Sequence, residues 1–583
     1  MTVEKLITDH IDIWSSALQT RSTAGRSSNG KIDLYGIKKL RELILELAVR
    51  GKLVPQDPND EPASELLKRI AAEKAELVKQ GKIKKQKPLP EISEDEKPFG
   101  LPEGWEWVRL GDLTSKITDG VHNTPKYLNE GVAFISVKDI DGNKISFNNC
   151  KFISQEQHEE INQRCNPEKG DLLICRIGTL GRVTIVDTDR PFSLFVSVGL
   201  IKTLLNTFSV DYLHKAFYSP CLLSQMEEIK VGGSHTNKLN LGDIPNLLIP
   251  FPAEKEQEKI VVKIAKLTSL CDQLEQQSLT SLDALQQLVE TLLATLTDSQ
   301  NAEELAENWT RISQHFDTLF TTKASIDALK QTILQLAVMG KLVSQDPNNE
   351  PASELLKRIE QEKSRLVASS NLKTSASYVI NSNDAYLKIP ESWEWIRLGN
   401  IAKFIDYRGK TPNKINTGVR LITAKNIRNG YIDLQPEEFI SENDYVEWMT
   451  RGFPKKGDLL FTTEAPLGNA AIIDIEDKFA LAQRAICLQW HIEQISPFML
   501  LQFMSSPFQK QLVANATGMT ALGIKASKLK EIPVVVPPLD EQYLIVKTVK
   551  ELFTFCDHLK SRLQSTQQTQ LHLADALTDA ALN

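Results

Sequence analysis

The feature that most constrains the fold of this chain is an internal duplication. Residues 52–70 recur at residues 341–359 with two substitutions. Two shorter motifs recur in the same order, Trp-Glu-Trp-x-Arg-Leu-Gly from Trp105 and Trp393 and Gly-Asp-Leu-Leu from Gly170 and Gly457. The copies keep an almost constant separation, so the chain is one unit of about half its length, present twice. Two copies are too few for a solenoid and predict a pseudo-twofold molecule.

Each copy ends in a long stretch without proline or glycine, residues 254–297 and 539–583. Apolar side chains recur there in steps of three and four, at Ile260, Ile264, Leu267, Cys271, Leu274, Leu285, Leu288 and Leu292, and at Ile545, Val549, Leu552, Cys556, Leu559 and Leu563. This spacing predicts two long antiparallel coiled-coil helices that pack on each other, with Ser278 and Ser281 interrupting the first. Two unrelated amphipathic helices, each packed on its own domain, are the alternative.

Between the helical parts lie short β-prone runs separated by Gly, Asn and Asp. In the first copy they are residues 132–137, 172–175, 183–186, 195–198 and 247–251, with a helix expected over 209–230. In the second copy they are residues 419–423, 458–461, 470–473, 485–488 and 533–536. The pattern predicts an α+β protein with two globular α/β domains separated by the long helices.

The organisation follows from these patterns. Helices are expected at about 3–20, 36–50 and 62–80, followed by a solvated Lys-, Glu- and Pro-rich linker to residue 100. The N-terminal part matches the segment 302–360, so we expect it to fold back onto the C-terminal helix. The predicted segments are 1–100 (N-terminal helices), 101–253 (first globule), 254–389 (central long helix and helical segment), 390–538 (second globule) and 539–583 (C-terminal helix).

Composition limits the class of protein. The 583 residues carry a net charge of −7, so any nucleic-acid role depends on local basic patches. The seven cysteines form no Cys-x-x-Cys pair, which favours reduced thiols over a zinc site or a disulfide framework. No apolar run of membrane-spanning length and no signal pattern occur, so a cytoplasmic protein is expected.

No catalytic motif is found. Gly409-Lys410-Thr411 resembles the end of a phosphate-binding loop, but Phe404 stands where that loop needs glycine. There is no dinucleotide-binding glycine motif, no amino-methyltransferase motif and no histidine pair spaced for a metal. We therefore expect a binding protein rather than an enzyme, with no metal site.

Polar loops in both globules are the candidate binding residues. Seven basic residues and one acid, Asp406, lie between Lys403 and Arg428, whereas the matching loop of the first globule is less basic. Two further loop pairs follow, 176–181 with 462–468 and 232–238 with 517–521. Such side chains contact base edges or phosphates in DNA; solvated surface loops are the alternative for any single residue. The predicted DNA contacts are His122, Asn123, Thr124, Lys126, Lys138, Arg176, Thr179, Ser234, His235, Asn237, Lys238, Tyr407, Arg408, Lys410, Thr411, Lys414, Lys425, Asn426, Thr463, Glu464, Thr517 and Thr520.

With these motifs the chain resembles the specificity subunits of type I restriction-modification systems. The residues that carry the resemblance are Gly51-Lys-Leu-Val-Pro-Gln-Asp-Pro with its repeat at Gly340, the two Trp-Glu-Trp starts, the Gly-Asp-Leu-Leu pairs and Asp540-Glu-Gln542. The run Tyr407-Arg-Gly-Lys-Thr-Pro412 with residues 421–426 looks like a target-recognition domain of that family.

The resemblance implies two target-recognition domains, each binding one half of a bipartite, asymmetric site in double-stranded DNA, and helices that set the spacer. It implies no catalytic site in this chain. Two modification subunits would bring S-adenosylmethionine for adenine methylation, and two restriction subunits would bring ATP- and Mg-dependent cleavage. The alternative function is a non-catalytic coiled-coil adaptor that holds two ligand-binding domains apart.

Overall fold

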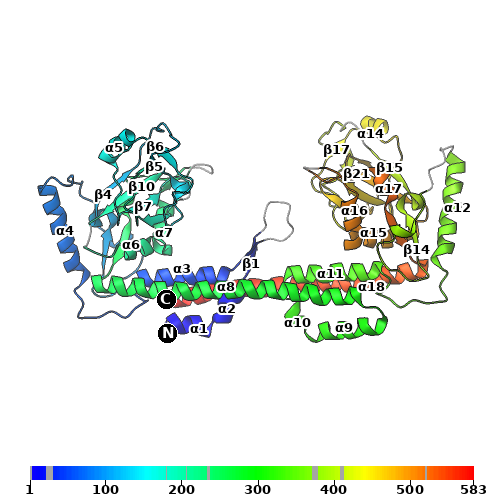
Figure 1. Cartoon of the computed structure of the whole chain (residues 1–583), viewed down its shortest axis with the longest axis horizontal. Helices are drawn as coiled ribbons and strands as arrows, with labels where there is room; N and C mark the ends of the chain where they lie inside the picture. Colours follow the sequence, from blue (N-terminus) through cyan, green and yellow to red (C-terminus); the bar gives the residue numbers. More distant parts are fainter. Residues whose placement is uncertain are drawn as a thin grey trace. The chain divides into compact units, whose positions relative to one another are not determined.

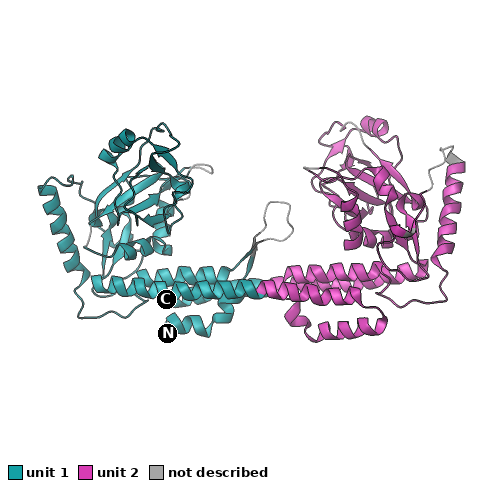
Figure 2. Cartoon of the chain, viewed as in Figure 1, with its two compact units in different colours: residues 1–281, 566–583 teal, residues 282–565 magenta. Residues whose placement is uncertain are grey.

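The computed structural model describes residues 3–21, 31–178, 180–204, 207–232, 237–370, 378–407, 412–518 and 521–582. Contacts divide the chain into two compact units: unit 1 is Met1–Ser281 with Thr566–Asn583, and unit 2 is Leu282–Ser565 (Figure 2). Each unit contains one globule that mixes helices and strands, so the predicted α+β class is confirmed. The finer division into five segments stays a prediction.

Two long helices pass between the units. Helix α8 spans Glu254–Asp298 and runs from unit 1 into unit 2, whereas α18 spans Leu539–Leu582 and runs from unit 2 into unit 1 (Figure 1). The predicted pair of long helices with opposite chain directions is therefore confirmed. At 1.5 Å per residue, the 45 residues of α8 extend over about 67 Å. The division between the units falls in α8 directly after Ser281, one of the two interrupting serines.

The apolar stripe of α8 changes position along the helix. Ile260, Ile264, Leu267, Cys271 and Leu274 are buried as predicted, and Leu285 and Leu292 pack partly buried against the core of unit 2. Leu288 was predicted to be buried and is 49% exposed, while the buried residues there are Val289, Leu293 and Leu296. The reason is that α11 (Lys323–Val338) shares one apolar cluster with α8 and α18 in unit 2, so α8 buries a face different from a two-helix seam.

The N-terminal helices of unit 1 differ from the prediction in one place. Helices α3 and α4 span Tyr35–Val49 and Ala63–Lys79, close to the expected ranges. The expected helix over 3–20 is two helices, α1 (Val3–Asp9) and α2 (Ile11–Ser16), because His10 between them has a non-helical backbone conformation (φ −125°, ψ 25°). Strands β1 (Gln19–Arg21) and β2 (Lys31–Asp33) then form a two-stranded sheet.

Within unit 1 the N-terminal part contacts the last turns of α18. The Ser16 hydroxyl donates to Gln570 Oε1 (3.0 Å), and the Tyr35 hydroxyl donates to Asp575 Oδ1 (2.7 Å). In unit 2 the corresponding helical segment comprises α9 (Ala302–Gln314), α10 (Phe316–Leu319), α11 and α12 (Ala352–Ser370).

The duplicated Gly-Lys-Leu-Val motif closes the C-terminal end of each long helix. The Lys341 ammonium donates to the carbonyls of Thr297 (2.6 Å), in the last turn of α8, and of Ser299 (2.8 Å), directly after it. Lys52, its counterpart, donates to the carbonyl of Leu582 at the end of α18. A cation at these unpaired carbonyls satisfies them and opposes the negative end of the helix dipole.

Both globules have the same strand order. In unit 1 a four-stranded antiparallel sheet has the order β4-β10-β7-β8, and a three-stranded sheet β6-β5-β9 contains one parallel pair, β5 with β9. The elements are β3 (Glu106–Arg109), β4 (Thr114–Asp119), β5 (Val132–Ile135), β6 (Lys151–Ile153), α5 (Gln155–Arg164), β7 (Leu172–Cys175), β8 (Val183–Ile185), β9 (Phe192–Leu194), β10 (Val198–Thr203), α6 (Val210–Phe217), α7 (Pro220–Glu228), β11 (Lys230–Val231), β12 (Lys238–Leu239) and β13 (Leu248–Phe251).

Unit 2 repeats this topology as β15-β21-β18-β19 and β17-β16-β20, with β16 and β20 parallel. Its elements are β14 (Glu394–Arg397), α13 (Leu398–Ile401), β15 (Ala402–Asp406), β16 (Val419–Ile422), β17 (Phe439–Ile440), α14 (Glu442–Trp448), β18 (Leu459–Thr463), β19 (Leu467–Ile472), β20 (Phe479–Leu481), β21 (Ala485–Trp490), α15 (Ser496–Met504), α16 (Ser506–Ala514), α17 (Ala526–Glu531) and β22 (Pro533–Val536).

Two predicted elements of the first globule are wrong in detail. The run 195–198 is a turn between β9 and β10, closed by a hydrogen bond from the Val198 amide to the Phe195 carbonyl (2.9 Å). The helix expected over 209–230 is split into α6 and α7, because Ser219 caps the second helix through the Leu222 amide and Pro220 starts it.

The aspartates of the two Gly-Asp-Leu-Leu motifs are structural. Asp171 accepts from the Glu168 amide (2.7 Å) and pairs with the Lys202 ammonium (2.8 Å). Asp458 accepts from the Lys455 amide (2.8 Å) and from the side chain of Gln489 (2.6 Å). Burial raises the pKa of both carboxyls, and these donors act against that shift. The motif therefore closes the turn that leads into β7 and β18.

Candidate DNA-recognition surface

In unit 1 three chain segments meet at the end of the four-stranded sheet. The Arg176 amide, after β7, donates to the Ser197 carbonyl before β10 (2.9 Å). The Arg176 carbonyl accepts from the amide of Leu239 in β12 (2.8 Å), and Ile177 forms a β-bridge with Lys238. The second and third predicted loops of this globule are thus joined through their backbones.

Unit 2 repeats this backbone arrangement with different side chains. The Thr463 amide donates to the Arg484 carbonyl (2.8 Å), and the Thr463 carbonyl accepts from the Ile524 amide (3.0 Å). Glu464 forms a β-bridge with Gly523, as Ile177 does with Lys238 in unit 1. The backbone contacts are shared, and the side chains that they carry are not.

In unit 1 a buried aspartate binds two arginine side chains. Asp119, the last residue of β4, is 2% exposed and forms ion pairs with Arg176 and Arg164. The Nε2 atom of His122 lies 3.2 Å from Asp119 Oδ2, and the His122 side chain is largely exposed. Asp119 therefore connects the first predicted loop to the second, and it holds the side chains of Arg164 and His122 at the surface.

In unit 2 the joined loops border an open groove of about 490 Å³. Its lining comprises Thr463, Glu464, Gln483, Arg484, Thr517, Ala521, Gly523, Ile524 and Lys525. Arg484 has a side chain that is 57% exposed and lies 3.7 Å from Glu464. Its φ is 67°, a left-handed backbone conformation that side chains other than glycine rarely adopt. Ala465 (φ 45°) is the other such residue among those described and lies in an adjoining loop; strained backbone of this kind concentrates at functional sites.

Three of the five described cations in the basic run of unit 2 are neutralised by acids from later in the chain. Three of its cations form ion pairs, Lys414 with Glu438 (2.7 Å), Arg420 with Glu437 (3.0 Å) and Arg428 with Asp433 (3.2 Å). The sequence of the run shows only Asp406 as an acid. Its strength as a local positive patch was therefore overestimated, because the neutralising partners come from the segment 433–438.

The predicted contact residues divide into three groups. Nine are exposed, namely His122, Asn123, Thr124, Lys126, Lys138, Lys238, Lys414, Lys425 and Thr517, and Asn237 and Glu464 are half-buried. Seven lie outside the described residues, namely Thr179, Ser234, His235, Arg408, Lys410, Thr411 and Thr520. For the first group, contact with DNA stays a prediction.

The third group is buried, which differs from the accessible position expected of a DNA contact; contact with DNA stays a prediction for its members. Asn426 is 1% exposed and bonds the backbone of Thr423, Asp433 and Pro436. The buried Tyr407 hydroxyl donates to the Gly452 carbonyl.

The other two buried members are Arg176 and Thr463. The Arg176 guanidinium is occupied by Asp119 and by the Leu239 carbonyl (3.1 Å), and Thr463 lies in the lining of the groove with little exposed surface. Position in a polar loop predicts an accessible side chain in these four cases, whereas tertiary contacts bury each of these side chains.

Sequence reasoning missed Gln483, Arg484 and Lys525 in unit 2 and Asp119 and Arg164 in unit 1. Gln483 and Arg484 stand between two apolar strands and belong to no motif. A signal was nevertheless present in the duplication, since the turn that contains Ser197 in one copy contains a glutamine and an arginine in the other.

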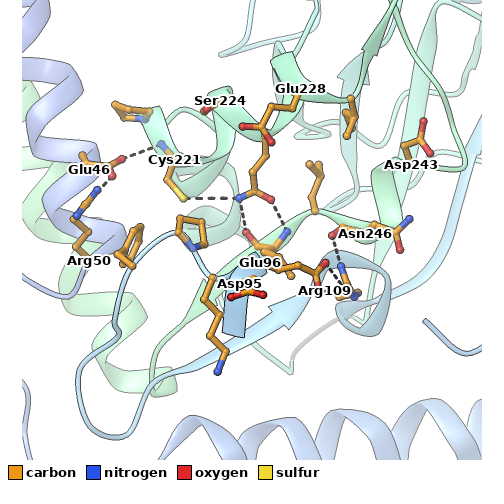
Figure 3. Close-up of a pocket in the computed structure, with 18 of the residues that line it drawn as sticks. Glu46, Arg50, Asp95, Glu96, Arg109, Cys221, Ser224, Glu228, Asp243 and Asn246 are labelled. Carbon is orange, nitrogen blue, oxygen red and sulfur yellow. Dashed lines mark hydrogen bonds and ion pairs between the residues drawn. The ribbon is translucent and has the colours of Figure 1, made fainter. Parts of the chain in front are cut away.

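A second groove, of about 740 Å³, lies in unit 1 between α3, α7 and residues 95–99 (Figure 3). On its wall the buried carboxylate of Glu46 accepts from Arg50 Nε (2.8 Å) and from the Cys221 amide (2.9 Å). Arg109 pairs with Glu96 (2.9 Å) on the opposite side. None of the predicted contact residues lines this groove, and the hydrogen bond from the Cys221 amide to Glu46 joins α7 of the globule to α3.

Within the described ranges, no three His, Cys, Asp or Glu side chains are grouped to hold a metal ion. None of the described helices combines the length and apolar character that crossing a lipid bilayer requires.

Comparisons with known proteins agree with the duplication. Residues 102–284 and 390–566 both match the type I restriction modification DNA specificity domain. The EcoEI and EcoAI type I restriction enzyme specificity subunits of Escherichia coli are 47% and 48% identical to this chain, and each alignment covers 100% of both chains.

Solved structures are more distant. The HsdS subunit from Thermoanaerobacter tengcongensis is 18% identical, with a TM-score of 0.39 over 83% of this chain and 98% of that one. A family match in both copies and relatives of the same length with almost half of the residues identical show that this chain belongs to the family of non-catalytic type I restriction-modification specificity subunits.

Proposed function

We propose that each globule binds one half of a bipartite, asymmetric site in double-stranded DNA. The observation that carries this proposal is the shared backbone arrangement at the two sheet ends, which presents different residues in the two units. Position by position, Ser197 corresponds to Arg484, Ile177 to Glu464 and Lys238 to Gly523. Two similar scaffolds with different polar side chains are suited to reading two different base sequences.

The spacer between the half-sites would be set by α8 and α18. These are the two stretches of chain that pass from one unit to the other, and both are continuous helices across the division. A helix has a defined rise per residue, so its length can determine the separation of two binding surfaces.

The same subunit would recruit two modification subunits and two restriction subunits. The names of the relatives, specificity subunits of restriction enzymes, support a place in such an assembly. Adenine methylation and cleavage, with their cofactors S-adenosylmethionine, ATP and Mg, would belong to those partners.

The test is DNA binding by the purified chain together with its modification subunits. Selection from random duplexes should recover one bipartite sequence with a constant gap, and sequencing of methylated DNA from cells carrying the system should give the same motif. Recovery of no sequence above competitor DNA would favour the alternative, an adaptor with two ligand-binding domains.

A further inference from the structure

A strip of lysines follows α4 in unit 1. Lys79, Lys82, Lys84, Lys85 and Lys87 occur within nine residues, and no acid occurs between Glu76 and Glu91. All five side chains are exposed. None of their ammonium groups has a carboxylate or other hydrogen-bond partner among the described residues, whereas Lys414 in the basic run of unit 2 pairs with Glu438. We call these five residues the lysine strip.

The strip is held on the globule by hydrogen bonds rather than left as a free linker. The side chain of Gln86 donates to the Ser115 carbonyl in β4 (3.0 Å), and the Lys74 ammonium donates to Gln86 Oε1 (2.8 Å) and to the Gly111 carbonyl (2.6 Å). Four residues later, Arg109 Nε donates to the Pro90 carbonyl (2.7 Å). The end of the strip around Gln86, and the chain that follows it to Pro90, are thus held beside β3 and β4.

The neighbouring surface is also positive. Lys116 lies on β4 next to the strip, and its pKa is lowered by burial and further by the charges of Lys202, Lys84 and Arg164. Like charges held on a fixed backbone repel one another, so the arrangement is unfavourable without an anionic partner. It occurs in a chain whose net charge is −7.

The second copy lacks the strip. The corresponding stretch after α12, residues 368–378, contains Lys373 as its one basic residue. The feature is therefore not a requirement of the duplicated fold, because the other unit is built without it.

We propose that the lysine strip binds the phosphate backbone of duplex DNA next to the half-site read by unit 1, without reading its sequence. This inference rests on the proposed function, since it needs DNA on the same unit. Lysine ammoniums act as point charges toward phosphates and carry no base preference. DNA fits the strip better than an acidic protein, because five unpaired cations in a short stretch, from the end of α4 to Lys87, match the regular row of phosphates on a duplex.

The test uses the complex with modification subunits and the variant Lys84→Gln/Lys87→Gln. If each lysine neutralises one phosphate, the slope of log K against log salt should become less steep by about 1.8. Affinity at low salt should fall equally for the recognised duplex and for an unrelated one, and the methylated sequence should not change. The matched control, Lys68→Gln/Lys357→Gln, removes the same charge, but these lysines already pair with Glu65 and Glu354.

The outcomes separate the two proposals. If the wild-type complex prefers no duplex sequence, the proposed function is wrong. If the wild-type complex binds its site and the variant keeps the same slope of log K against log salt, the proposed role of the lysine strip is wrong. An equal change of the salt slope in the control variant would also overturn the proposed role of the lysine strip. Weaker binding of the modification subunits with an unchanged slope would overturn it too, and would indicate an acidic protein surface as the partner. Circular dichroism should show that both variants fold.

Discussion

The guanidinium of Arg41, on α3, lies 2.6 Å from the carboxylate of Asp272, on α8. Unit 2 repeats the contact between Lys330, on α11, and Asp557, on α18 (2.5 Å). Each aspartate directly follows the buried cysteine of its long helix. The duplicated Cys-Asp pair therefore has two roles, an apolar contact inside and an ion pair to the covering helix at the edge.

This ion pair should contribute little to stability. Its carboxylate is largely exposed, so Arg41→Ala should lower the free energy of unfolding by about 0.5 kcal/mol. Urea unfolding of Arg41→Ala, Asp272→Ala and the double variant gives the coupling energy. A coupling of several kcal/mol would contradict the expectation, and Arg365→Ala, whose partner Glu362 lies within the same helix, is the control.

Asp119 should matter far more than Arg41. Asp119→Asn leaves the buried Arg176 without its charged partner, which we expect to cost about 3 kcal/mol in stability. It should also weaken binding to one half-site, because His122 and Arg164 lose the group that positions them. Asp189→Asn, at an exposed position of the same globule, should change neither quantity. Equal effects of the two substitutions in urea unfolding would refute the assigned role.

Two glutamates in the first turns of the long helices predict that the stability of the protein depends on pH. Burial raises the pKa of Glu256 and Glu541 above the usual 4.5, although Gln56 and Gln345 donate hydrogen bonds to them. Across the interval from 4.5 up to the raised pKa, the folded protein keeps protons that the unfolded chain has lost, so these groups lower stability as pH rises.

The variant Glu256→Gln/Glu541→Gln should lose this component of the pH dependence. Melting temperatures measured from pH 4.5 to 7.5 should fall less steeply for the variant than for the wild-type protein. Glu65→Gln/Glu354→Gln, at exposed positions of α4 and α12, serves as the control. Parallel curves for the wild type and the first variant would show that burial does not perturb these carboxyls.

Arg484 is the side chain most expected to read bases in unit 2. It is exposed, borders the groove and is displayed by a left-handed backbone position. Arg484→Ala should weaken one half-site by about 1–3 kcal/mol if a bidentate contact to a base is lost, and the other half-site should be unaffected. Competition with duplexes altered in either half measures both effects. A uniform loss on all sequences would assign Arg484 to phosphate contact instead.

The length of the long helices should determine the spacer of the DNA site. Inserting four residues after Ser278 in α8, and four after Ser565 in α18, adds about 6 Å of helix, close to two base-pair steps. The methylated motif should acquire a longer gap between unchanged half-sites. An unchanged gap in a folded, active complex would exclude this role for the helices.

Much of the fold was predictable because it is encoded locally. The limits of α8 and α18 follow from the three-and-four spacing and from the prolines before each helix, and most strands of the globules were found from short apolar runs. The failures at His10 and Leu288 have a different origin. There a chain turn or a third helix decides which residues are buried, and neither is visible in the spacing of a single segment.

The candidate site was less predictable for the same reason. Loop composition located two of the three segments that meet at each sheet end, but it did not distinguish the exposed Lys425 from the adjacent buried Asn426. It also found no signal for Arg484, which owes its position to a turn between two strands.

The sequence by itself determined the duplication, the two long helices, the mixed globules and the family, because repeats and periodicity are properties of contiguous residues. Only the tertiary structure decided which polar side chains are free to meet a partner. Arg176 is used inside the fold by Asp119, and Lys414 is neutralised by Glu438, whereas the lysine strip has no such partners among the described residues. These outcomes depend on pairing between residues far apart in the chain, which folding brings together.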